Sequence, residues 1–186
     1  MAKELNKLHD GTSMRVEFTA SPRGMQVKYS TDRLVVAPES SALIITAKNT
    51  EDESLAHAEA LGENILKTLP HTPVSAFGIN FAFRAEELNP ELATLFRLSD
   101  DERLAEQDHT TLSLSIKRSI RWKDAMLNVT LTTSDEEPLY VDLNFHHEVD
   151  DAEDASTRLS GRTLSYRDEG LTFLENVYNL KIRETS

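Results

Sequence analysis

The stretch that decides the fold is HTTLSLSIKRSIRWKDAMLNVTLTTSDEEPLYVDLNFHHEV, residues 109–149. It contains three segments in which apolar and polar residues alternate. Because successive side chains of a strand point to opposite sides, each segment predicts a strand with one apolar face. The apolar positions are Leu112, Leu114, Ile116, Ile120 and Trp122, then Leu127, Val129 and Leu131, then Leu139, Val141, Leu143 and Phe145. Three such strands in succession predict an antiparallel meander.

The pairing within this meander can be predicted by parity, because paired residues point to the same side of a sheet. A two-residue turn at 123–124 places Ile120 opposite Leu127 and keeps both apolar sets on one face. The next loop must then have an odd number of residues, which residues 134–138 provide. Arg118 shares the parity of the apolar residues. It either reaches past the sheet edge, pairs with a buried carboxylate or marks a binding site, and its long apolar stem favours one of the first two.

A second meander is predicted in the N-terminal part of the chain. Residues 16–29 alternate on either side of a Pro- and Gly-containing turn, and a four-residue loop there pairs Phe18 with Val27. Residues 34–36 rejoin the same face. The run 42–47 has consecutive apolar residues and predicts a short strand that is buried on both sides or lies at the centre of a sheet.

Two main helices are predicted, at about 51–69 and 165–182. The first opens with the capping-box pattern of residues 50–53 and carries a single apolar stripe, so it should lie across a sheet face. The second carries two adjacent stripes, formed by Tyr166, Gly170, Phe173, Val177 and Leu180 and by Leu171, Leu174 and Tyr178. Such a wide apolar arc predicts contact on two sides, in a groove or at a subunit interface.

The remaining segments predict smaller elements. Residues 74–85 contain three phenylalanines at alternate positions and predict a strand at the centre of the core. Short helices are expected after Asn89 and within residues 99–107, the second opening with another capping box. The acidic residues 148–154 and the polar stretch that continues to Gly161 are expected to form a solvated loop.

These elements predict an α+β fold in which antiparallel β-sheets, built from two meanders, are covered by two main helices. We expect a single domain over residues 1–186, because no segment rich in Gly, Pro or Ser divides the chain. The two meander-and-helix halves, 13–69 and 74–182, have a similar architecture but share no residue-level repeat.

Composition excludes several classes of protein. The chain has no cysteine, which removes disulfides, thiolate zinc sites and cysteine nucleophiles. The first residues lack the apolar segment of a signal peptide, and no apolar run has the length of a membrane span, so we expect a soluble cytoplasmic protein. The net charge of −12 disfavours nonspecific binding to nucleic acid or to anionic membranes.

The sequence contains no familiar catalytic or cofactor motif. None of the phosphate-binding glycine patterns or the common hydrolase motifs occurs, although His71 and His109 could act as acids or bases. The segment around His146 and His147 contains metal-ligand types. Adjacent residues of a regular strand point to opposite sides, however, so both imidazoles cannot bind one ion. We therefore predict no metal and no cofactor.

Three functional hypotheses follow. The favoured one is a non-catalytic protein that binds a protein partner or forms a homo-oligomer through a sheet edge and the C-terminal helix. The helix residues expected at that contact are Tyr166, Phe173, Leu174, Val177 and Leu180. The first alternative is an enzyme of an unmarked class with a pocket near Arg118, His147 and Glu148. The second alternative, less favoured on charge, is a nucleic-acid binder whose basic strand contacts anions through Lys117, Arg118, Arg121 and Lys123.

Overall fold

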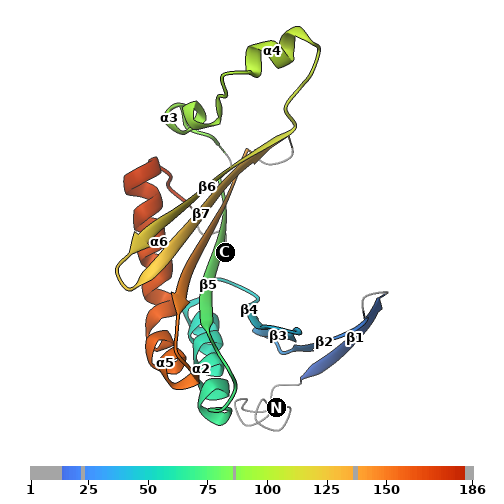
Figure 1. Ribbon diagram of the computed structural model, residues 1–186, viewed down its shortest axis with the longest axis vertical. Helices are drawn as coiled ribbons and strands as arrows, with labels where there is room; N and C mark the ends of the chain where they lie inside the picture. The colour runs from blue at the N-terminus through green and yellow to red at the C-terminus, as the bar shows by residue number, and fades with distance from the viewer. Residues whose placement is uncertain (1–13, 22–23, 86, 136–137, 183–186) are drawn as a thin grey trace. The chain divides into compact units, whose positions relative to one another are not determined.

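The computed structural model describes residues 14–21, 24–85, 87–135 and 138–182 (Figure 1). Its strands are β1 (Arg15–Ser21), β2 (Gly24–Ser30), β3 (Leu34–Pro38), β4 (Leu43–Ala47), β5 (Ala76–Ala85), β6 (Ser113–Trp122), β7 (Ala125–Ser134) and β8 (Leu139–Glu148). Its helices are α2 (Asp52–Thr68), α3 (Pro90–Ala93), the 3₁₀ turn η1 (Thr94–Phe96), α4 (Asp101–Glu106), α5 (Ala152–Leu159) and α6 (Arg162–Tyr178). The strands form two four-stranded antiparallel sheets. The predicted α+β fold is thereby confirmed.

The chain divides into two compact units. The first contains residues 1–74 and 150–164, and the second contains residues 75–149 and 165–186. The segment 150–164 therefore belongs with the N-terminal sheet, although the sequence pattern placed it in the second half.

The sheet of the second unit has the strand order β5-β8-β7-β6. The predicted turn and parity are both confirmed, since Ile120 pairs with Leu127 and Leu131 pairs with Val141. All four strands therefore direct their apolar residues to the same face.

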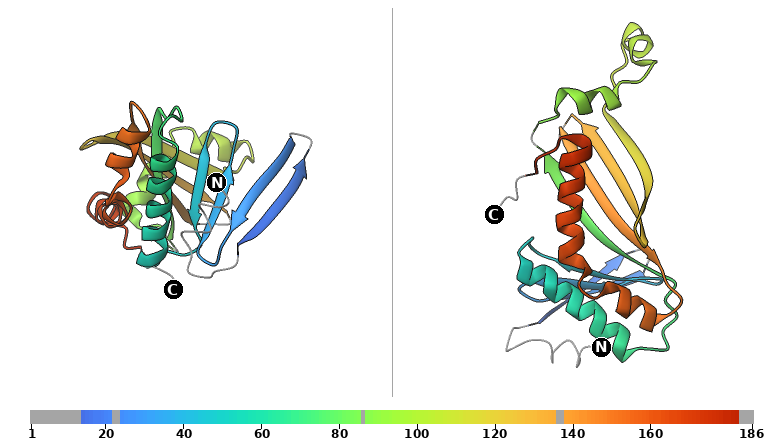
Figure 2. Two further views of the ribbon diagram at one scale, coloured as in Figure 1. Left: turned by 90° about the horizontal axis from the view of Figure 1, so that it is seen from below. Right: turned by 90° about the vertical axis from the view of Figure 1, so that its left-hand side faces the viewer.

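Helix α6 covers that apolar face (Figure 2). The Phe145 ring stacks on Tyr166 with centroids 4.2 Å apart, and the rings of Trp122 and Phe173 form a T-shaped contact with centroids 5.5 Å apart. Gly170 lies so close to the sheet that an added Cβ would be 2.8 Å from Leu143 Cδ1. Aromatic rings and a close helix–sheet contact thus form the core of this unit.

The expected central position of the 74–85 strand is wrong, because β5 lies at the edge of the sheet and pairs only with β8 among the described strands. Its Phe77, Phe81 and Phe83 are half-buried, and only Ile79 is fully buried. The centre is formed by β7 and β8, whose inward residues are almost completely inaccessible. Phenylalanine content therefore did not identify the central strand.

The other face of this sheet carries a hydrogen-bonded row of polar side chains. Ser119 Oγ donates to Asn128 Oδ1 at 2.7 Å, and Asn128 Nδ2 donates to Asn144 Oδ1 at 3.0 Å. Asn144 Nδ2 then donates to Asn80 Oδ1 at 2.6 Å. Because the four residues occupy one cross-strand register on β6, β7, β8 and β5, the row ties together all four strands of the sheet.

The sheet of the first unit has the order β1-β2-β3-β4, and its first hairpin pairs Phe18 with Val27 as predicted. Leu34 and Val36 of β3 and Leu61 of α2 form its buried cluster, so α2 lies across a sheet face as expected. β4 is an edge strand with Ile44 exposed. The expectation that residues 42–47 would be central or buried on both sides is therefore wrong.

Residues 152–159 form the helix α5, which corrects the expectation of a solvated loop. Asp151 caps it, accepting a hydrogen bond from the Asp154 N–H at 2.9 Å. Ala152 and Ala155 are buried, and α5 packs against α2. The acidic residues that suggested a loop include the cap and the first helical turn, where the helix dipole favours negative charge.

Helix ends also differ from the predicted capping boxes. α2 starts one residue later than expected, with Glu51 as an N-cap that makes no side-chain cap bond, and Glu53 instead forms an ion pair with Arg33. α4 likewise lacks a side-chain cap bond. The Asn89 cap of α3 is confirmed, since its Oδ1 accepts from the Leu92 N–H at 2.8 Å.

The C-terminal helix ends at Tyr178 rather than at residue 182. Asn179 has a φ of 51°, in the left-handed region, and the Leu180 N–H donates to the Leu174 carbonyl at 3.1 Å. The Asn179 N–H donates to the Glu175 carbonyl at 3.0 Å, which is the hydrogen bond of an αL helix end. It turns the chain back, so that Leu180 is buried instead of continuing the helix.

We predict that Leu127→Ala lowers the unfolding free energy of the second unit by about 2–5 kcal/mol, because it removes a fully buried side chain from a central strand. The matched control is Met126→Ala, one residue away on the other face and 40% exposed, for which a change below about 1 kcal/mol is expected. Urea unfolding followed by fluorescence measures both, since Trp122 is the only tryptophan and lies in this unit. Equal destabilisation by the two variants would contradict the assigned core face.

Candidate functional site

An apolar surface extends beyond the helix-covered part of the N-terminal sheet. Val16 lies opposite Tyr29, which lies opposite Val36 of the buried cluster, so Val16 and Phe18 project from the core side of the sheet. Yet Val16 is 40% exposed and Phe18 is 66% exposed. Large apolar side chains continuous with a core but accessible to solvent are typical of an interaction surface.

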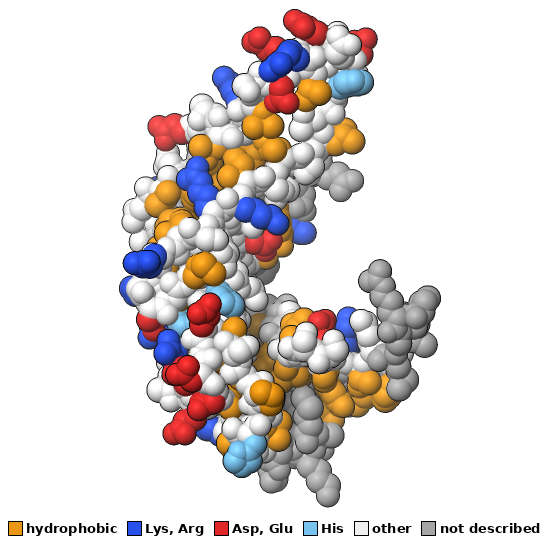
Figure 3. Space-filling view, in the orientation of Figure 1, with side chains coloured by type: hydrophobic (Ala, Val, Ile, Leu, Met, Phe, Trp, Pro, Cys, Tyr) orange, Lys and Arg blue, Asp and Glu red, His pale blue; other side chains and the backbone are white. Residues whose placement is uncertain are grey.

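The position of α2 explains this exposure. The helix packs mainly over β3 and β4, where Leu43, Ile45 and Ala47 contact the buried cluster. β1 lies at the opposite edge of the sheet, separated from β3 by β2. Hydrophobic side chains are consequently visible at the surface of this sheet in Figure 3. We call Val16 and Phe18, together with the outer edge of β1, the β1 surface.

The opposite side of β1 is polar. Arg15, Glu17 and Thr19 alternate with the apolar residues and are exposed. Among the described strands β1 pairs only with β2, so its other edge presents backbone N–H and C=O groups that another strand can bind. β1 therefore combines the exposed apolar side chains and available edge of the β1 surface with exposed charges on its other side.

The helix residues predicted to contact a partner mostly belong to the core of the second unit. Tyr166, Phe173, Leu174 and Leu180 are buried, and only Val177 is exposed, at 55%. The wide apolar arc is occupied by the rings of Phe145 and Trp122 and by the chain that turns back after the helix. The sequence indicated correctly that two sides of α6 are apolar, but both sides are covered by residues of the same unit.

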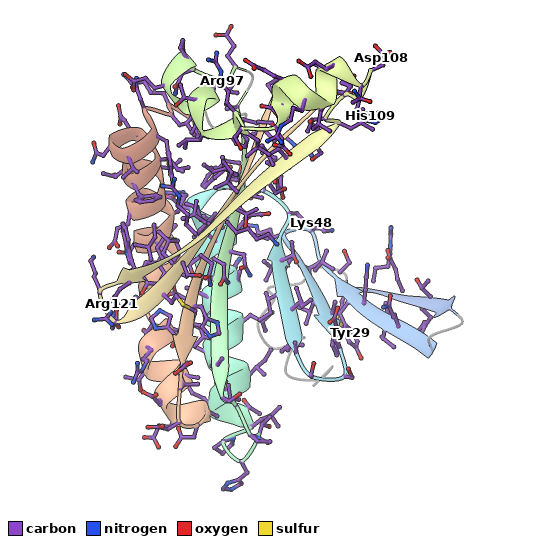
Figure 4. All side chains as sticks on the ribbon, turned by 45° about the horizontal axis from the view of Figure 1, so that its top comes forward. Tyr29, Lys48, Arg97, Asp108, His109 and Arg121 are labelled. Carbon is purple, nitrogen blue, oxygen red and sulfur yellow. The ribbon has the colours of Figure 1, made fainter. Side chains whose placement is uncertain are left out.

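The basic residues of the β6 region do not form one surface. Lys117 and Arg121 lie on the open polar face of the sheet, and Arg121 projects near the β6–β7 turn (Figure 4). Arg118 lies on the helix-covered side but is exposed at the sheet edge, as expected for a cation that reaches past the edge. Lys123 is in the turn, with a φ of 51°.

Lys123 takes part in a cluster that the sequence did not reveal. Its Nζ lies 2.7 Å from Glu169 Oε1, while Trp122 Nε1 donates to Glu169 Oε2 at 3.0 Å and Ser165 Oγ donates to Oε1 at 3.0 Å. Burial raises the pKa of the Glu169 carboxyl group, but these donors outweigh burial and the pKa is lowered overall. The cluster fastens the β6–β7 turn to α6. It could not be predicted from local sequence, because its residues are distant along the chain.

The three residues of the predicted enzyme pocket are separate. His147 is buried, with its Nε2 2.9 Å from the Tyr166 hydroxyl oxygen, whereas Glu148 is exposed on the other face of β8. Arg118 is in register with Val129 and Leu143, so strand spacing places its Cα about 17 Å from that of His147. No shared site is formed, which removes the observation that motivated this hypothesis.

The two adjacent histidines face opposite sides of β8, as predicted. His147 stacks on Phe77 in the core, with centroids 4.6 Å apart, and His146 lies on the polar face. Within the part of the chain that the structure describes, no three His, Cys, Asp or Glu residues are grouped so that they could hold a metal ion. No described helix is long and apolar enough to cross a membrane.

Comparisons of this chain with models of protein families, with curated proteins and with solved structures found no match.

We predict that Glu169→Gln lowers the stability of the second unit at neutral pH, because the amide replaces the charge that Lys123 contacts. A carboxyl group with a lowered folded-state pKa stabilises the fold above its unfolded pKa of about 4.3 and loses this contribution as the pH falls through the folded value. The difference between wild type and variant in urea midpoint should therefore shrink between pH 7 and pH 3.

Glu175→Gln is the control, since Glu175 is more exposed and its ion pair with Lys181 is longer, at 3.6 Å. It should change the midpoint little at either pH. A constant difference for Glu169→Gln across the pH range would mean that the carboxylate charge is not what stabilises the turn.

Proposed function

We propose that this chain is a non-catalytic protein that works through protein–protein contacts, and that the contact is made by the β1 surface. The observation that carries the proposal is the exposure of Phe18 on the core side of the N-terminal sheet. The absence of cysteine from the sequence fits a cytoplasmic location, which we include in the proposal.

The energetics favour covering this surface. Complete burial of a side chain such as Phe or Val contributes about 1.5–3 kcal/mol relative to exposure. Phe18, which is 66% exposed, forgoes most of that gain in the isolated chain, and Val16, which is 40% exposed, forgoes part of it. A strand added to the outer edge of β1 would satisfy the backbone groups there while extending the apolar face, which is how many proteins bind extended polypeptide.

The alternatives receive less support from the geometry. An enzyme pocket at Arg118, His147 and Glu148 would need side chains that lie apart to converge. A nucleic-acid surface on the basic strand would retain Lys117 and Arg121, but Asp142 and Glu148 lie on the same polar face, and the chain carries a net charge of −12. Contact through the C-terminal helix would rely on Val177 alone among the exposed residues of the predicted set.

Photo-cross-linking tests the proposal. p-Benzoylphenylalanine in place of Phe18 should give a discrete protein-sized adduct in cells, because the partner would lie against that side chain. The same amino acid in place of Thr172, which is exposed on α6, should give none. Val16→Lys, placed beside the cross-linker, should abolish the adduct because it introduces a charge into the apolar contact. Absence of an adduct at position 18, or identical adducts at both positions, would refute the proposal.

A further inference from the structure

The arrangement of β1 specifies what can pair with it. A new strand must place its side chains on the same two faces as β1, so its apolar residues must align with Val16 and Phe18. Its charged residues must then align with Arg15 and Glu17 on the other face. A second copy of β1 has apolar residues at the same alternate positions, so it can place them on the same face as Val16 and Phe18.

Two copies related by a two-fold axis perpendicular to the sheet pair antiparallel and keep each face on its own side. Such a pairing must be centred on a residue, because only then do opposed side chains share a face. Three centres, at Val16, Glu17 and Phe18, pair both charged residues of β1 with residues of the same strand, which runs from Arg15 to Ser21. The charges of β1 distinguish among them.

Centring on Glu17 sets two like charges directly opposite each other, which disfavours the pairing. Centring on Phe18 places Arg15 opposite Ser21 and forms no ion pair. Centring on Val16 places Arg15 of each copy opposite Glu17 of the other, giving two ion pairs on the polar face. On the apolar face it brings Val16 against Val16 and Phe18 against Met14.

We propose that two copies of this chain pair antiparallel through β1, centred on Val16, so that their N-terminal sheets join into one continuous sheet. This inference rests on the proposed function and names the partner. Charge complementarity carries it, since β1 opposes each of its exposed charges with the opposite charge in this register. The other edge strand of the sheet, β4, has no charged residue and its core side is covered by α2.

Charge-swap variants test the pairing by sedimentation velocity over a range of concentrations. Arg15→Glu alone, or Glu17→Arg alone, sets like charges opposite each other twice and should raise the dimer dissociation constant about tenfold or more at low salt. The double variant restores two opposite-charge contacts and should return the constant to within about threefold of wild type.

An equimolar mixture of the two single variants should also associate, because the copy with two acidic residues then faces the copy with two basic residues. A variant that fails to fold could not be rescued by mixing, so this measurement separates misfolding from lost pairing. Failure of both the double variant and the mixture to restore association would overturn the inference.

A wild-type chain that stays monomeric at every concentration would overturn self-pairing as well. If the adduct at position 18 still formed in that case, the proposed function would stand with a different protein as partner. Absence of that adduct would remove the proposed function itself.

Discussion

Antiparallel pairing forces opposed side chains onto the same side of a sheet, and the arrangement of this protein follows from that constraint. In the second unit it brings the inward residues of β6, β7 and β8 onto one apolar face, which α6 then covers. In the first unit it places Val16 and Phe18 on the same face as the buried Leu34 and Val36. The same rule therefore generates both the core and the exposed surface that we propose as an interface.

Local periodicity predicted much of the fold, because alternation along a strand reflects which face is apolar. It specified the pairing of Ile120 with Leu127 and of Phe18 with Val27. It did not specify which strands lie at an edge, since that depends on pairing between segments distant in sequence. β4 and β5 were both expected to be central, but both are edge strands. Consecutive or aromatic apolar residues also occur on edge strands when a helix or neighbouring rings cover one face.

The misread helices have similar explanations. The buried side of α5 consists of the small residues Ala152, Ala155 and Ser156, and the acids that suggested a loop cap and begin the helix. The partner face predicted on α6 was inferred from a real excess of apolar residues. That excess is used within the unit, because Leu180 turns back at Asn179 and aromatic side chains of the sheet fill the other side. By contrast, Val16 and Phe18 resemble ordinary core residues in the sequence, and only the position of α2 shows that they are exposed.

The path of the chain between the two units bears on its synthesis. The first unit is completed by residues 150–164, which follow the entire second sheet in sequence. On the ribosome, α2 can therefore pack against α5 only after β5 to β8 have been synthesised. The Glu59 carboxylate of α2 then accepts hydrogen bonds from the Gly161 N–H at 2.8 Å and the Thr163 N–H at 2.6 Å, where α6 begins. A fragment ending at residue 74 would lack these late contacts, so the first unit can be completed only after residue 164 has been translated.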